Sequence, residues 1–317
     1  MLTNTVASEF LYQFGVSIIE SLLFILMLWI NLLPEPFRDP FQFAFMQRAL
    51  LTSMLVGCVC GVLSCYVVLK RWSLLGDAIS HAVLPGVAIA YILGWPFFIG
   101  AFTTGTLTSL GIGFIERNSR IKEDAAMGIM FTGSFALGVV LISHIATSTH
   151  LMHILFGNVL GVRIPALLLT LVCSVLTITV VLMLYKEFQL YIFDPIQANT
   201  LGLNTAKLHY GLMILLTLTI VASLETVGII LVVAMLITPG ATAYLLTNRL
   251  SKMILIAALI GISSSVIGLF LSFTYNLASG GAIVLVATVL FFLAFFFSPH
   301  QGLVQRVYRV KQRDIEM

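Results

Sequence analysis

This sequence contains about ten apolar segments, the longest near 20 residues. Such a pattern is compatible with few folds. A helix of about 20 residues spans the roughly 30 Å hydrocarbon core of a bilayer. Only 9% of the residues are charged, against about 25% in a soluble domain, so this chain lacks the polar surface that water would require. A transmembrane β-barrel would show short alternating segments instead. The sequence therefore predicts an all-α, polytopic integral membrane protein.

A hydropathy window of about 19 residues locates the individual segments. They lie at 12–33, 47–69, 74–94, 96–115, 125–145, 164–185, 208–222, 226–247, 252–273 and 281–298. The segment 208–222 is short, and one interpretation is a half-helix that continues into the next segment. We therefore expect about eight to ten true spans.

The positive charges predict how the chain is oriented. Most of the 16 Lys and Arg residues fall in connections that alternate to one side of the membrane. This side carries Lys70, Arg71, Arg117, Arg120, Lys122, Lys186, Lys207, Arg249, Lys252, Arg306, Arg309, Lys311 and Arg313, whereas the other carries Arg38, Arg48 and Arg163. Because cytoplasmic loops are enriched in Lys and Arg, the first side is expected to be cytoplasmic, with both termini inside the cell.

Asp77 and His81 are the residues inside a span that most directly indicate chemistry. Their spacing of four places them on one helix face, and an aspartate at that depth needs a partner or a polar cavity. Carboxylate and imidazole together suit a divalent transition metal. Pro85 follows and interrupts the helical hydrogen bonding. From spacing alone, a metal half-site and a simple Asp77–His81 pair both remain open.

Other histidines and acids lie in connections on the external side. His144, His150 and His153 cluster there and are either metal donors or ordinary surface histidines near the membrane. Glu225 falls between two segments and either faces a pathway or lies in a hydrated loop. We keep His153 and Glu225 as secondary metal-site candidates.

The longest internal connection, 186–207, contains the pattern of a short helix. Asp194 suits a helix N-cap, Pro195 suits the first helical position, and Gly202 suits the stop. The pattern predicts a helix of about two turns, which on this basis alone is an ordinary loop helix.

At these residues the sequence resembles the manganese/zinc/iron permease family of ABC importers. The stretches that carry the resemblance are GDAISHAVLPGVAIAYILG, KEDAAMGIMFTGSFALGVVLIS, HLMHILFGNVLGV, FDPIQANTLGL and TVGIILVVAMLITPGATAYLLT. The first is the most specific, and the five follow the family's order. The resemblance divides the chain into an added span and external loop (1–46), the metal-permease domain (47–298) and a basic cytoplasmic tail (299–317).

The resemblance implies a transport subunit of the bacterial cytoplasmic (inner) membrane, not an enzyme. Two permease chains, identical or siblings, would form the pathway for Mn²⁺, Fe²⁺ or Zn²⁺, lined by Asp77 and His81. Cytoplasmic ATPase subunits would dock on the helix near 194–202 and bind the ATP, and an extracellular or periplasmic metal-binding protein would deliver the ion. This chain has no GxxxxGK[ST] loop, which agrees with ATP binding on a separate chain. It would bind no cofactor of its own.

Other functions fit the sequence less well. An ion-coupled secondary transporter would use Asp77 and His81 as a proton relay and would need no ATPase. An intramembrane metalloprotease lacks support because HExxH is absent, and a purely structural subunit would tolerate changes at both residues. The basic tail from Arg306 to Arg313 is expected to lie beside anionic lipid and is too short to indicate nucleic-acid binding.

Overall fold

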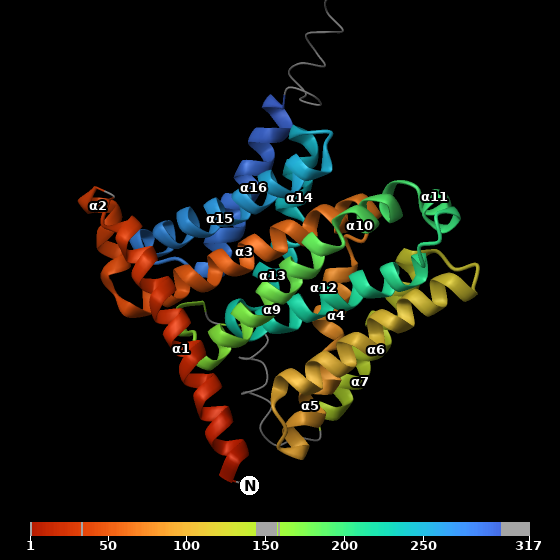
Figure 1. The fold of residues 1–317 in the computed structure, drawn as a ribbon, viewed down its shortest axis with the longest axis horizontal. Coiled ribbons are helices and arrows are strands. Elements are labelled where there is room, and N and C mark those ends of the chain that lie inside the picture. Colours follow the sequence, from red (N-terminus) through yellow and green to blue (C-terminus); the bar gives the residue numbers. More distant parts are fainter. Residues whose placement is uncertain (1, 33, 144–156, 158, 299–317) are drawn as a thin grey trace, which may run out of the picture.

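The computed structural model describes residues 2–32, 34–143, 157 and 159–298, and Figure 1 shows its fold. This part of the chain is all-α, and no strand occurs in it. Eight spans are single helices, and each is long and apolar enough to cross a bilayer. They are α1 (Leu2–Ile30), α3 (Ala44–Lys70), α6 (Phe97–Asn118), α7 (Glu123–Ser143), α9 (Ile164–Met183), α12 (Thr205–Val227), α15 (Leu250–Tyr275) and α16 (Ser279–Phe297).

Two further spans are broken in the middle. The first consists of α4 (Leu75–Ala82) and α5 (Leu84–Leu93), and the second of α13 (Ile229–Met235) and α14 (Thr238–Leu246). A proline in the first turn of α5 and of α14 removes an amide donor at each break. The described residues thus contain ten candidate spans, at the positions that the hydropathy window predicts.

Short helices complete the described chain. They are α2 (Glu35–Arg38), η1 (Asp39–Gln42), η2 (Val159–Gly161), α10 (Tyr185–Phe193) and α11 (Pro195–Thr200). In Figure 1, α11 lies towards the right edge of the molecule near one end of α12, and α10 lies to the left of α11. We call this end of the bundle, which carries Lys70, Arg117 and Lys207, the basic end.

The half-helix interpretation of segment 208–222 is wrong, because α12 is a continuous helix of 23 residues. Polar side chains near its two ends lower the local hydropathy, but most of them are buried in protein. Thr217 and Thr226 are fully buried and hydrogen-bond to carbonyl groups of their own helix. Thr217 also donates to Ser109 of α6 at 3.3 Å. Such polar contacts hold helices together where lipid offers no partner.

The helices at the centre of the bundle approach each other closely through glycine. Gly57 of α3 and Gly261 of α15 face each other, and a Cβ at either position would lie within 2.6 Å of the other residue's carbonyl oxygen. Gly61 lies in the same way against the backbone of Ala257. The Gly57-x-x-x-Gly61 pattern therefore serves helix packing, as small residues commonly do in membranes.

Gly261→Ala is expected to destabilise the fold by about 1–3 kcal/mol, the usual cost of overpacking, because its Cβ would lie 2.0 Å from the Gly57 oxygen. Thermal unfolding of the detergent-solubilised protein measures the change. Gly128→Ala in α7 is the matched control, since a Cβ there meets nothing within 4 Å. Equal unfolding midpoints for the two variants would contradict the close α3–α15 contact.

Candidate functional site

Helix α4 has one open face, and Asp77 and His81 are the two residues on it. The other six of its eight residues are buried, whereas the side chains of Asp77 and His81 are 49% and 30% exposed. A helix in the middle of the bundle normally buries its polar residues or pairs them. This helix instead presents a carboxylate and an imidazole to the outside of the chain.

The two donor atoms are spaced as ligands of a single metal ion would be. His81 Nε2 lies 3.5 Å from Asp77 Oδ1, which is longer than an ordinary hydrogen bond. Two donors that each lie about 2.1 Å from one ion are separated by roughly 3.0–3.6 Å at the usual coordination angles. The separation of the pair therefore suits a passing divalent cation.

Aromatic residues of α7 fix the orientation of the His81 ring. The rings of Phe131 and Phe135 lie 5.4 and 5.6 Å from it, both in edge arrangements. Such contacts stabilise a ring in one orientation. Since the two phenylalanines are partly exposed, the surface beside α4 is apolar around the polar pair.

The described residues supply only part of a coordination shell at this face. No group of three or more His, Cys, Asp or Glu side chains that could hold a metal occurs among the residues that the structure describes. A divalent transition metal usually takes four to six ligands. The remaining ligands would be water or groups outside the residues that the structure describes.

The secondary candidates do not join this pair. Glu225 lies exposed in the last turn of α12, at the end opposite the basic end. It lines a small apolar pocket with Val83, Val87 and Phe98, and neither Asp77 nor His81 belongs to that lining. His144, His150 and His153 lie outside the described residues.

The short helix predicted near 194–202 is present as α11. The Asp194 side chain accepts a hydrogen bond from the Gln197 N–H at 2.8 Å, and Pro195 occupies the first turn. Gly202 ends the helix with a φ of 83°, a conformation that suits glycine. Two apolar residues beside these signals are strongly exposed, Ile196 at 77% and Leu201 at 67%.

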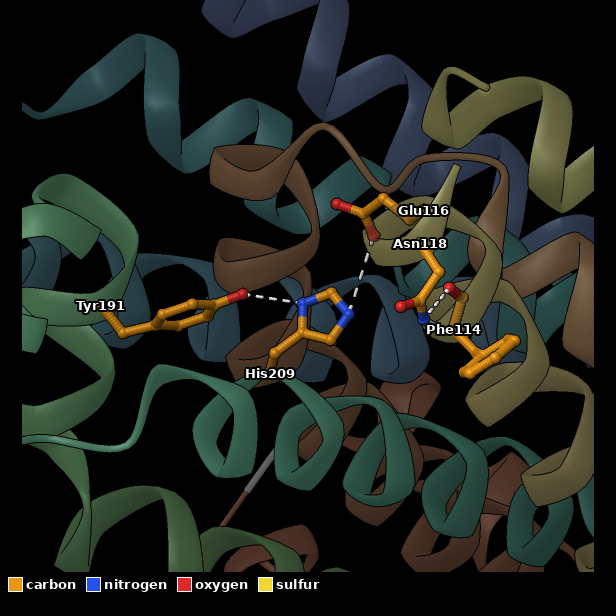
Figure 2. Close-up of polar contacts among 5 residues, drawn as sticks. All are labelled: Phe114, Glu116, Asn118, Tyr191 and His209. Atoms are coloured by element: carbon orange, nitrogen blue, oxygen red, sulfur yellow. Dashed lines mark hydrogen bonds and ion pairs between the residues drawn. The ribbon is translucent and has the colours of Figure 1, made fainter. Parts of the chain in front are cut away.

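A buried polar cluster at the basic end was not predicted from the sequence (Figure 2). His209 of α12 is 5% exposed, and its Nδ1 lies 2.8 Å from the Tyr191 hydroxyl of α10. Its Nε2 lies 3.7 Å from Glu116 Oε2 of α6. Burial raises the pKa of the Tyr191 hydroxyl, and nearby Glu116 adds to this shift, so the hydroxyl stays protonated. The only signal in the sequence is an acid and a histidine at the ends of apolar segments.

Comparison with known proteins gives a consistent match over most of the chain. The model of the ABC 3 transport family matches residues 42–298. The manganese transport system membrane protein MntC of Listeria innocua is 58% identical over 83% of this chain and 94% of its own length. A probable iron transport system membrane protein of Haemophilus influenzae is 52% identical over 82% of this chain and 96% of its own.

A solved structure has the same fold. It is that of PsaBC from Streptococcus pneumoniae in complex with Fab, with a TM-score of 0.76 and 44% identity. The alignment covers 85% of this chain and 98% of the other.

Asp194→Ala is expected to loosen α11, because the loss of an N-cap costs about 1 kcal/mol. Hydrogen exchange at the backbone amides of Gln197 to Leu203 should become several-fold faster. Asp194→Asn keeps an oxygen that accepts from the Gln197 N–H, so this variant should retain most of the protection. Unchanged exchange in the alanine variant would show that the cap does not stabilise the helix.

Proposed function

The chain belongs to the ABC 3 transport family, and from this premise we propose that it is the permease subunit of an ATP-driven importer of a divalent transition metal. The chain is a multi-pass membrane protein and a transport component, with ten candidate spans in its described part. The observation that carries the proposal is the open face of α4, where Asp77 and His81 hold two donors 3.5 Å apart.

Mn²⁺ and Fe²⁺ are the substrates that we favour. Carboxylate and imidazole are ligands that both ions accept. Related proteins are named for manganese and for iron transport. Zn²⁺ accepts the same two donors, so it is a competitor at this site.

A second permease chain completes the pathway in this proposal. A pair of donors on an open face holds an ion weakly, which suits transport because the ion must leave again. When two permease chains meet at this face, the same pair from each, or an equivalent pair from a sibling chain, surrounds the ion. The apolar surface beside α4, including Phe131 and Phe135, would pack in that interface.

The basic end faces the cytoplasm of a bacterial cell in this proposal, in line with the positive-inside rule. Both chain termini then lie in the cytoplasm. Helix α11 contacts the ATPase there, and Ile196 and Leu201 provide the exposed apolar side chains that a groove of a partner protein would bury. Asp194, Pro195 and Gly202 hold this helix in shape, and ATP binds to the partner.

A metal-binding protein delivers the ion at the opposite end. Glu225 is exposed at that end of α12, which supports a role in receiving the ion, and His153 is retained as a second candidate from the sequence alone. The segment 1–46 is an added span with its loop, 47–298 is the metal-permease domain and 299–317 is a cytoplasmic tail.

Asp77→Ala is expected to reduce metal uptake to the background of cells that lack the chain, because the ion loses one of two donors. Radioactive Mn²⁺ uptake in a metal-starved host that also carries the ATPase and the binding protein measures the effect. Co-purification with the ATPase should be unchanged. Asp124→Ala, which removes an exposed carboxylate from the first turn of α7, is the control and should transport normally. Normal uptake by the Asp77 variant would rule out the role of this pair.

A further inference from the structure

His209 lies where several parts of the structure meet at the basic end. Its buried ring contacts the Trp72 ring at 5.2 Å and the Tyr210 ring at 5.2 Å, both edge-on. Its two nitrogens face Tyr191 and Glu116. Helix α6 approaches this closely because residue 113 is glycine, where a Cβ would lie 2.9 Å from His209 Nε2.

The Tyr191 contact connects His209 to α11. Tyr191 lies in the last turn of α10, and Asp194 follows as the residue between α10 and α11. The Asp194 N–H donates to the Leu190 carbonyl at 2.9 Å, and the Asp194 carbonyl accepts from the Ala198 N–H at 3.0 Å. These bonds connect α11 to the last turn of α10, which carries Tyr191.

The Trp72 contact connects His209 to α4. Trp72 is 1% exposed and lies directly before α4. Its carbonyl accepts from the Leu75 N–H at 3.0 Å, and its own N–H donates to Val67 of α3 at 2.8 Å. The backbone of Trp72 is therefore bonded to the first turn of the helix that carries Asp77.

The contact between His209 and Glu116 is incomplete in this conformation. His209 Nε2 and Glu116 Oε2 are buried atoms, and neither has a hydrogen-bond partner among the described residues. A protonated Tyr191 hydroxyl that donates to Nδ1 leaves the proton of the neutral ring on Nε2, directed at Glu116. Because unpaired buried polar atoms are unfavourable, closing the 3.7 Å gap would stabilise a second conformation.

We propose that His209 is a positioning residue that couples α11 to the metal-pathway helix α4. Tyr191 transmits the displacement of α11 to the imidazole, and Trp72 passes it on to α4. The His209–Glu116 hydrogen bond forms when the ATPase closes and is open in the conformation described. The imidazole ring would then have two positions, one with the His209–Glu116 hydrogen bond open and one with it formed. Energetic coupling between sites requires an element with two such states. This inference rests on the proposed import function and on the docking of the ATPase at α11.

Tyr191→Phe is the sharpest test because it removes the hydroxyl and keeps the ring. In proteoliposomes that contain the whole complex and receive Mn²⁺ from the binding protein, metal ions transported per ATP hydrolysed should fall about fivefold, the factor for one typical hydrogen bond. ATP hydrolysis and assembly of the complex should remain near wild type. Tyr210→Phe is the matched control. The Tyr210 ring also contacts His209, but the hydroxyl that hydrogen-bonds to His209 Nδ1 is that of Tyr191.

The outcomes separate the two proposals. An unchanged transport ratio in Tyr191→Phe, or an equal loss in Tyr210→Phe, overturns the coupling role of His209 and leaves the import function intact. No metal transport by the wild-type complex overturns the import function itself. Glu116→Ala added to Tyr191→Phe should lower the ratio little further, since both residues act through the same ring. If the losses of the two single variants multiply in the double variant, the shared role of Tyr191 and Glu116 is overturned.

A structure of the wild-type complex with ATP-bound ATPase subunits tests the same inference without any variant. His209 Nε2 and Glu116 Oε2 are then expected at a hydrogen-bonding distance of about 3 Å. A gap that stays at 3.7 Å in the closed complex would overturn the proposal.

Discussion

A bilayer offers no hydrogen-bond partner to a polar group, and the arrangement of this chain follows from that constraint. The hydroxyls of Thr217 and Ser265 donate to carbonyls of their own helices and reach neighbouring helices. The two broken spans contact each other, since α13 packs against α4. Leu236, at the break between α13 and α14, packs against Gly76 beside Asp77. Irregular backbone and the metal-pathway candidates thus occur together.

The same constraint explains what the sequence could predict. The ten spans, the α11 signals at Asp194 and Gly202, and the glycine contact at Gly57 follow from local patterns, and the structure confirms them. The continuity of α12 did not follow, because a hydropathy window treats each segment as if it faced lipid. The His209 cluster did not follow either, since it joins α10 and α12 to α6, which lies far from both in the sequence. No spacing rule connects Glu116 with His209.

The two pairs of a histidine and a carboxylate, Asp77–His81 and Glu116–His209, differ in their exposure. Asp77 and His81 are partly exposed and separated by 3.5 Å, which suits an ion that binds briefly. His209 and Glu116 are similar in donor type and separation, but His209 is enclosed by aromatic rings and has Lys70 close by, over the Tyr191 ring. An open pair would suit a passing cation, as proposed for Asp77 and His81, whereas an enclosed pair next to positive charge would be better suited to the coupling role proposed for His209.

In the proposed function, ATP hydrolysis on a partner chain drives metal import through this permease. Its most direct test is metal uptake in a metal-starved host that carries the chain, its binding protein and an ATPase with either an intact or an alanine-substituted Walker lysine. Mn²⁺, Fe²⁺ and Zn²⁺ are offered in competition. We expect uptake to be lost when the Walker lysine is replaced by alanine. When the lysine is intact, we expect Mn²⁺ or Fe²⁺ to compete best. Uptake that persists without the lysine would contradict the proposed function and would identify an ion-coupled transporter in which Asp77 and His81 carry protons.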